Sequence, residues 1–220
     1  MPQDEQALRE LDTSYETNRV FEVEKVGLGF RLVSRQLPEA RRQGFDVLAH
    51  ELGSEDKPWT DAWVATDPSG SLVGFVATSF ESWNARLRLW HLYTAPRSRR
   101  GGVARRLVEE AAAEGRRRHA VHLFVETPSV NAPAIAAYER LGFHLVGLDS
   151  SLYDGTPAAG ETAVPIRAMR CIDGRNAVSH SRSMTPDRRR AHGASPRGGP
   201  VPYGGIDVLR NSRKLVRLFV

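Results

Sequence analysis

The stretch that decides the fold is RLRLWHLYTAPRSRRGGVARRL, residues 86–107, which is followed by VHLFVET at 121–127 and NAPAIAAYERLGF at 131–143. Residues 87–94 are an apolar, aromatic-rich run of strand length, and Pro96 stops it because proline cannot donate to a sheet ladder. Gly101 and Gly102 then open a helical pattern whose apolar face holds Val103, Leu107, Val108, Ala111 and Ala112. These segments predict a strand, a glycine turn, a helix, a second strand and a second helix.

The glycine turn predicts a binding site for an anion. Where a strand passes through glycines to the start of a helix, free backbone N–H groups and the helix dipole point at one spot, and a phosphate can approach the backbone closely. Five arginines add positive charge nearby: Arg97, Arg99, Arg100, Arg105 and Arg106. Neither G-x-x-x-x-G-K-[ST] nor G-x-G-x-x-G occurs in the chain, so nucleoside triphosphate and NAD loops are excluded.

The turn and the last helix together resemble a known pair of motifs. Residues 99–104 match R-x-x-G-x-A, and Asn131, Ala134 and Tyr138 match N-x-x-A-x-x-x-Y, followed by Gly142 and Phe143. This pair resembles the acetyl-CoA pyrophosphate loop and the adjacent helix of the GNAT superfamily of N-acetyltransferases. The resemblance implies an α/β fold with a mixed, mostly antiparallel central sheet, splayed parallel strands and flanking helices, and it implies acetyl-CoA as the cofactor.

The same resemblance implies which residues hold the cofactor. The strand before the loop would pair with the pantetheine arm through Leu92, Tyr93 and Thr94. The loop would hold the pyrophosphate, through Arg99, Arg100, Gly101, Gly102, Val103, Ala104 and Arg105. Asn131 would contact the CoA arm or cap its own helix, and the two roles are compatible.

Acetyl transfer to an amine needs a neutral amine, a donor for the developing oxyanion and an acid for the departing thiolate. Tyr138 matches the tyrosine that protonates the thiolate in GNAT enzymes; its alternative is an aromatic packing role under Phe143. Glu126, at the end of a buried strand, is the best candidate for the base, because burial would raise its pKa toward a useful value. His91 is a second candidate, and deprotonation through ordered water would need no dedicated base.

A closer resemblance is to streptothricin N-acetyltransferases. It covers residues 14–170 and rests on segments such as VFEV at 20–23, SWN at 82–84, GLDS at 147–150 and GE at 160–161. It implies acetylation of an amine in the β-lysine part of streptothricin, and hence antibiotic resistance. The candidates for binding the cationic amine are Glu22, Glu81, Trp83, Asp149, Tyr153 and Glu161.

The sequence departs from that family in three places. The family has acidic residues in the strand before the loop, where this chain has Trp90, His91 and Tyr93. It has a strand before the first helix, whereas this chain begins almost at the helix, so we expect that first strand to be missing. Pro165 and the segment after it replace a regular last strand. The missing acids leave open a peptide amine or a polyamine as the acceptor, and also a degenerate acyl-CoA-binding protein without catalysis.

The rest of the chain predicts the other elements of such a fold. They are a helix at 4–11, a strand or hairpin at 20–33, a variable connection at 35–59 with a helical piece at 39–52, a hairpin at 61–80, a strand at 144–148 and a last strand at 163–169. The hairpin turns at DPSG, residues 67–70, which suits a type I turn. Pro165 predicts that the last strand lies at a sheet edge or is broken.

The net charge of +5 and the pI near 9.8 come from the C-terminal segment. The last 50 residues hold 10 of the 31 basic residues and 3 of the 26 acidic ones, so residues 1–170 carry 21 basic and 23 acidic side chains. We expect a GNAT domain at 1–170 and a disordered Arg/Gly/Pro/Ser-rich tail at 171–220, with a frameshifted or read-through end as the alternative. A nucleic-acid partner is not favoured, because only the tail is basic.

Cys171 is the single cysteine, so an intramolecular disulfide is excluded, and no Cys/His cluster has the spacing of a metal site. No apolar run approaches the length of a membrane span, and the N-terminus lacks the layout of a signal peptide. We therefore expect a cytoplasmic protein that acts on a small-molecule amine without a metal or a membrane. The oligomeric state, a homodimer included, stays open.

Overall fold

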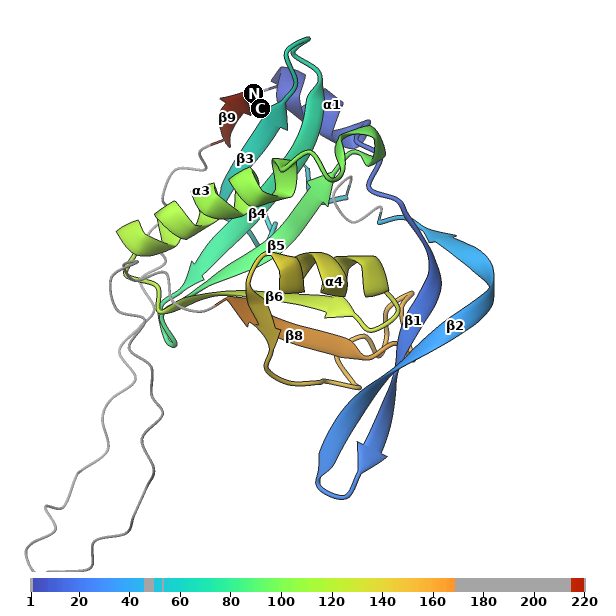
Figure 1. The fold of residues 1–220 in the computed structure, drawn as a ribbon. Coiled ribbons are helices and arrows are strands. Elements are labelled where there is room, and N and C mark those ends of the chain that lie inside the picture. Colours follow the sequence, from blue (N-terminus) through green and yellow to red (C-terminus); the bar gives the residue numbers. More distant parts are fainter. Residues whose placement is uncertain (1, 46–49, 53, 169–214, 220) are drawn as a thin grey trace, which may run out of the picture. The chain divides into compact units, whose positions relative to one another are not determined.

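A computed structural model describes residues 2–45, 50–52, 54–168 and 215–219. It contains a seven-stranded mixed sheet with the strand order β7-β8-β6-β5-β4-β3-β9 (Figure 1). The strands are β3 (Asp61–Thr66), β4 (Leu72–Glu81), β5 (Arg86–Thr94), β6 (His122–Pro128), β7 (Phe143–Leu145), β8 (Ala163–Ala168) and β9 (Leu215–Phe219). β5 and β6 are parallel, as are β3 and β9, and the other neighbours are antiparallel. The expected α/β fold with a mostly antiparallel mixed sheet is confirmed.

The helices with both ends in the described residues are α1 (Pro2–Arg9), α3 (Val103–Arg117), α4 (Ala132–Arg140) and the short 3-10 helix η1 (Pro96–Ser98). The helix predicted at 4–11 is confirmed as α1, which begins and ends two residues earlier; Leu8 is buried on the helix, and Leu11 is buried just beyond its end. The apolar stripe predicted for the helix after Gly102 is confirmed in α3, where Val103 and Leu107 are buried. None of the helices in the described residues is long and apolar enough to cross a membrane.

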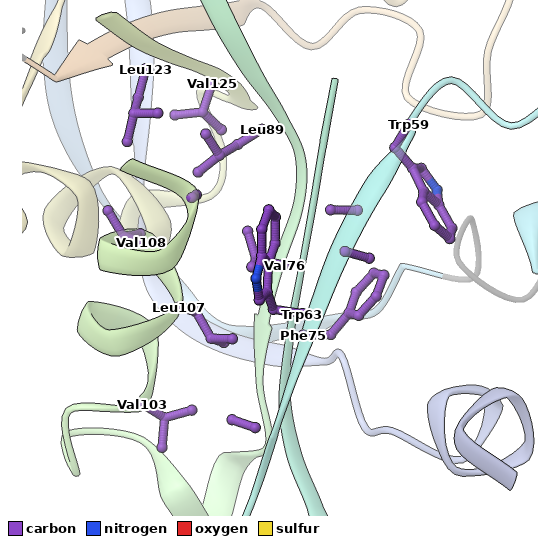
Figure 2. Packing of buried hydrophobic residues seen from close by; sticks show 14 of the residues in the cluster. Trp59, Trp63, Phe75, Val76, Leu89, Val103, Leu107, Val108, Leu123 and Val125 are labelled. Carbon is purple, nitrogen blue, oxygen red and sulfur yellow. The ribbon is translucent and has the colours of Figure 1, made fainter. Parts of the chain in front are cut away.

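α3 packs closely on one face of the sheet. Figure 2 shows Val103, Leu107 and Val108 directed toward the strands, with Trp59 and Phe75 on the other side of β4. Gly74 of β4 makes the close approach possible, because a Cβ there would lie 2.7 Å from Cγ1 of Val103 and 3.0 Å from Cδ1 of Leu107. The first turn of α3 is therefore seated directly against β4.

The hairpin predicted at 61–80 is confirmed as β3 and β4. Its turn is closed by the N–H of Gly70, which donates to the carbonyl of Asp67 at 2.8 Å. Gly70 has a φ of +83°, a conformation that side chains with a Cβ rarely adopt. The carboxylate of Asp67 also accepts from the N–H groups of Ser69 and Ser71, so the aspartate orders the turn.

β1 (Tyr15–Val26) and β2 (Gly29–Gln43) form a separate two-stranded hairpin, which turns at Gly27 with a φ of +59°. A hairpin was one of the two alternatives predicted for 20–33, and it is longer than expected. The variable connection predicted from residue 35 and the helical piece predicted from 39 are wrong up to Gln43, because pairing with the start of β1 extends the strand. Pro38 is tolerated since it lies between Gln36 and Arg41, where the register shifts. His50 and Glu51 are helical, and 46–49 lie outside the described residues.

The last predicted strand is confirmed as β8, but its expected edge position is wrong. β8 lies between β7 and β6. The carbonyl of Pro165 accepts from the N–H of Val146 at 3.0 Å, just beyond the end of β7. Because the N–H and C=O groups of a strand residue point to the same side, the donor that proline lacks would also face this end of β7. The strand therefore loses no ladder bond to β6. β7 itself ends at Leu145, earlier than the predicted 148.

The expectation of a disordered tail is wrong for Leu215–Phe219. These residues form β9, whose backbone pairs in parallel with β3 from Ala62 to Thr66. A short apolar run with high β-propensity can add to an open sheet edge, although it is too short to form a core by itself. Residues 169–214, which include Cys171, lie outside the described residues. For them the disordered tail stays a prediction.

Candidate functional site

The site forms where two parallel strands separate. β5 and β6 pair only from Arg86 and His122 to Arg88 and Phe124. Beyond this point β6 pairs with β8 on its other side, and within the described residues Leu89–94 of β5 face no strand on the β6 side. Backbone N–H and C=O groups that lack a strand partner need another one, so this part of β5 can pair with an extended ligand. This stretch contains three of the residues predicted to contact the cofactor: Leu92, Tyr93 and Thr94.

The predicted anion loop lies between the end of β5 and the start of α3. Arg100 and Gly102 have φ values of +66° and +86°, and Gly102 is the N-cap of α3. No side chain caps the helix, and its first turn holds no acidic residue. The first-turn amides of Val103, Ala104 and Arg105 are therefore available to an anion, which the helix dipole would also attract.

The arginines of the loop have different roles. Arg99 donates from Nε to the carbonyl of Thr94 at 3.2 Å and from Nη2 to the carbonyl of Ser14. Its side chain thus ties the loop to the start of the β1 hairpin instead of pointing at the open end of the helix. Arg97 lies 4.0 Å from the carboxylate of Asp67. Arg100 and Arg105 are exposed beside the helix N-terminus, where they can approach an anion.

α4 places Asn131 and Tyr138 near the separated strands. Asn131 is buried and its Oδ1 accepts from the N–H of Ala134 at 3.1 Å, so the capping role predicted as one of two alternatives is present. Tyr138 is also buried and packs against Phe143, with ring centroids 5.5 Å apart. Burial, and then the negative charge of Glu126, raise the pKa of Tyr138 above its ordinary value, which keeps the phenol protonated and able to donate.

Glu126, the predicted base, lies near the end of β6 with its carboxyl group largely shielded from water. Its Oε1 accepts a hydrogen bond from the hydroxyl of Tyr153 at 2.9 Å, whereas Oε2 is buried and has no hydrogen-bond partner among the described residues. Burial raises the pKa of Glu126, and the opposing effects of Tyr153 and Arg88 only partly offset this. A partly desolvated carboxylate with a free oxygen is suited to accept a proton or to bind a cation.

Two other predicted acceptor residues lie close to Glu126. Tyr153 contacts it directly, and the charge of Asp149 raises its pKa further. Asp149 is itself held by the N–H and hydroxyl of Ser151. Glu161 also has a buried oxygen, Oε2, that lacks a hydrogen-bond partner in the described part of the chain, and its charge raises the pKa values of Tyr15 and Tyr153. The structure therefore brings Glu126, Asp149, Tyr153 and Glu161 into one acidic cluster.

Three predicted acceptor residues have other surroundings. Glu22 is exposed and pairs with Arg35 across the β1–β2 hairpin, at 2.9 Å. Glu81, at the end of β4, pairs with Arg86 and lies 3.7 Å from Arg88, so its charge is already balanced. The side chain of Trp83 is 83% exposed in the β4–β5 turn. In the part of the chain that the structure describes, no direct contact links these three side chains to the acidic cluster. Among those residues, the only connection is through Arg88, which lies near Glu81 and whose charge lowers the pKa of Glu126.

A bulge in β5 changes which side chains face away from α3. Ala77 pairs with His91 and Thr78 with Leu89, so Trp90 is an extra residue in the register. The indole of Trp90 donates to Oγ of Ser79 at 2.7 Å, and the ring of His91 stacks on Phe75. Since Ser79 and Phe75 share one face of β4, Trp90 and His91 point to the same side of the sheet.

His91, the second candidate base, is buried and held at both ring nitrogens. Nε2 lies 2.6 Å from Oε2 of Glu51, and Nδ1 lies 3.2 Å from the hydroxyl of Tyr93. Sequence patterns did not indicate Glu51, because it precedes His91 by 40 residues and lies in a segment without a clear motif. A second missed feature is the aromatic row Tyr15, Phe45, Tyr93 and His91, in which neighbouring rings lie 5.6 to 6.2 Å apart.

Comparison with known proteins places this geometry in a family. Residues 30–143 match the sequence profile of the acetyltransferase (GNAT) family. A streptothricin acetyltransferase from Streptomyces lavendulae is 41% identical over 170 residues, which cover 74% of this chain and 88% of that protein. One from Escherichia coli is 28% identical over 163 residues, or 73% of this chain and 89% of that protein. The crystal structure of nourseothricin acetyltransferase, 38% identical, superposes with a TM-score of 0.66 and covers 78% of this chain and 95% of that one.

Proposed function

The chain belongs to the GNAT family of acetyltransferases, which use acetyl-CoA, and we propose that it acetylates a primary amine of a streptothricin-type antibiotic. The observation that carries the proposal is the unpaired stretch of β5 beside the uncapped N-terminus of α3. The name of the Streptomyces relative supports streptothricin as the acceptor, because this chain spans 88% of that protein.

The residues present fit acetyl-CoA on structural grounds. The first turn of α3 offers free amides without a competing carboxylate, and the exposed side chains of Arg100 and Arg105 can neutralise phosphate charge. Leu92 and Tyr93 would pair through their backbones with the pantetheine arm, and Asn131 would hold the start of α4 beside it. When bound, acetyl-CoA supplies an activated acetyl group as a thioester.

Two side chains of this protein would then carry out the proton transfers, one to a base and one from an acid. Glu126 accepts a proton from the incoming ammonium group through its unpartnered Oε2, which produces the nucleophilic amine. Tyr138, whose buried phenol stays protonated, donates to the departing thiolate sulfur. A backbone N–H of the unpaired part of β5 donates to the developing oxyanion.

The acidic cluster supports a cationic acceptor. Glu126 and Glu161 each present a buried carboxylate oxygen without a partner, and Tyr15 and Tyr153 adjoin them. Such oxygens are costly to bury alone, and ammonium groups of an acceptor would satisfy them. A second acceptor class, a peptide amine or a polyamine, is favoured by the aromatic and imidazole side chains of Trp90, His91 and Tyr93, which leave this part of β5 without a carboxylate.

A thiol-release assay with acetyl-CoA tests both acceptor classes. The chain would be offered streptothricin, an aminoglycoside, spermidine and a short peptide with a free N-terminus at the same concentrations. The proposal predicts the highest kcat/KM for streptothricin, and mass spectrometry of the product would show one added acetyl group. A higher kcat/KM for spermidine or the peptide would replace the streptothricin proposal by the second class.

A further inference from the structure

Glu51, His91 and Tyr93 form a continuous hydrogen-bonded chain. Oε2 of Glu51 lies 2.6 Å from Nε2 of His91, and Nδ1 of His91 lies 3.2 Å from the hydroxyl of Tyr93. The His91 side chain is 5% exposed and that of Glu51 is 17% exposed. One end of the chain of contacts therefore reaches water at Glu51, and the other end lies on the unpaired part of β5.

The identity of the partners sets the direction of the hydrogen bonds. Burial alone would raise the pKa of Glu51, but the hydrogen bond and charge of His91 and the indole N–H of Trp59 bring it below its ordinary value. An ionised carboxylate only accepts, so Nε2 of His91 carries a hydrogen whether the ring is charged or neutral. In the neutral form of the ring, which is the one that can take up a proton, Nδ1 is an acceptor and the hydroxyl of Tyr93 donates to it.

Tyr93 faces the region where acetyl transfer would occur. It lies in the stretch of β5 beyond the pairing with β6, and the charge of Tyr138 is among the influences that raise its pKa, after burial. Its ring lies between Phe45 and His91, which fix its orientation. With its proton directed at His91, the phenolic oxygen has free lone pairs for a donor on the acceptor molecule.

The stoichiometry of the reaction calls for more than one proton acceptor. An ammonium group becomes an amide as the N–C bond to the acetyl carbon forms and the C–S bond breaks, so the nitrogen loses two protons. One proton leaves before attack and the other after the N–C bond has formed. The thiolate gains one proton in exchange, and the net product is one proton released to water.

We propose that Tyr93, His91 and Glu51 carry away the proton that remains on the nitrogen after the N–C bond has formed. The inference rests on the proposed function, in which Glu126 removes the first proton. Tyr93 accepts the N–H proton as its own hydroxyl proton passes to Nδ1 of His91. The imidazolium that results is balanced by Glu51, through which the proton reaches water. Tyr93 touches the acceptor, whereas His91 and Glu51 act through Tyr93 and are positioning residues.

Other groups around the chain set its charge balance. Trp59 donates from Nε1 to Oε2 of Glu51 at 2.7 Å, and the charge of Lys57 also favours the ionised carboxylate. Phe75 stacks on His91 and carries no charge. On α4, Tyr138 is the titratable group whose charge raises the pKa of Tyr93. Within the described residues, Glu51 is thus the one carboxylate in contact with the imidazole of His91.

The test compares the pH dependence of four variants of the full chain with that of the unaltered protein. Glu51→Gln removes the charge but keeps the size, and Tyr93→Phe keeps the stacked ring. Both should lower kcat roughly 100-fold with little change in KM for acetyl-CoA, and raising the pH should not restore the rate. Glu126→Gln should recover at high pH, because the free amine then arrives already deprotonated. Trp59→Phe is the matched control, since it removes the other hydrogen bond to Glu51.

The outcomes separate the inference from the proposed function. A normal kcat in Glu51→Gln or Tyr93→Phe, or recovery of either at high pH, would overturn the inference while leaving acetylation in place. An equal loss in Trp59→Phe would assign Glu51 to packing and overturn it as well. If the unaltered protein acetylates no amine, the proposed function fails and the inference falls with it. A downfield imidazole N–H resonance should be present in the unaltered protein and in Trp59→Phe and lost in Glu51→Gln, and its persistence in Glu51→Gln would contradict the assigned contact.

Discussion

The hydroxyl of Tyr153 donates to Oε1 of Glu126 at 2.9 Å, while Oε2 of the same carboxylate is buried and meets no hydrogen-bond partner in the residues that the structure describes. The hydrogen bond therefore reaches only one oxygen of the proposed base. It stabilises the ionised form, but burial outweighs it, and the pKa of Glu126 stays above its ordinary value. The free oxygen is the one that can face an acceptor amine.

Tyr153→Phe should shift the pH dependence of catalysis. Loss of the hydrogen bond raises the pKa of Glu126 further, so the base is ionised only at higher pH. A hydrogen bond worth about 1 kcal/mol predicts that the acidic limb of kcat/KM moves up by about one pH unit, with the rate at high pH unchanged. Tyr15→Phe is the control, because the Tyr15 hydroxyl donates to Gln43. An acidic limb that stays in place would remove Glu126 from the role of base.

Glu126→Gln should stabilise the fold relative to the unaltered chain, and this gain should be larger at neutral pH than at acidic pH. The folded-state pKa of Glu126 is raised, so the folded protein favours the protonated carboxyl, and stability is lost as the pH rises through that pKa. Glutamine imitates the neutral form and avoids this loss. Thermal unfolding of both proteins at pH 4 and pH 8 measures the difference. If the difference in Tm between the two proteins did not grow with pH, it would contradict a buried carboxyl group with a raised pKa.

Gly102→Ala should weaken acetyl-CoA binding more than it weakens the fold. A Cβ at Gly102 meets nothing within 4 Å, but its φ of +86° is strained for alanine by about 1–2 kcal/mol. Relief of that strain would move the amides at the start of α3. Gly70→Ala is a matched control, with a φ of +83° and an equally open Cβ position in the β3–β4 turn. Calorimetry should show a higher Kd for acetyl-CoA in Gly102→Ala alone, and equal Kd values would reject the loop as the anion site.

Tyr138→Phe should lower turnover rather than cofactor affinity. The ring keeps its packing against Phe143, whereas the proton donor for the thiolate is lost. A general acid contributes about 100-fold or more, so kcat should fall by that order while the KM for acetyl-CoA changes little. Steady-state kinetics decide the point, and an unchanged kcat would leave Tyr138 with a packing role only.

Local patterns were sufficient to predict the strand, the turn and the two helices that surround the proposed cofactor site. The two glycines before α3 and the N-x-x-A-x-x-x-Y spacing are signals within one turn and one helix, and the structure has a strand, turn and helix where they indicate them. The contact of Glu51 with His91 could not be predicted, because it depends on tertiary packing between distant segments. The edge position predicted from Pro165 was wrong for a similar reason, because whether the sheet tolerates this proline depends on where β7 ends.

The strands at the start of the chain show the same limit. Residues 39–43 have no strong alternation, and they become part of β2 because β1 lies opposite them. Propensity is a weak guide where pairing with a neighbouring strand decides the conformation. Gly74 shows the opposite, because a glycine inside a strand can by itself indicate that another element packs closely there. In this structure that element is α3, through Val103.

The bulge at Trp90 frees one position of β5 from the pairing register with β4. Trp90 has no partner in that register, although its ring packs against the buried core and its indole donates to Ser79. An exchange at Trp90 would therefore alter the proposed acceptor face without shifting the pairing of Leu89 or His91 with β4. For directed evolution of acceptor choice, residue 90 is the first position to randomise, and the replacements that keep the fold are those that still fill the space beside the core.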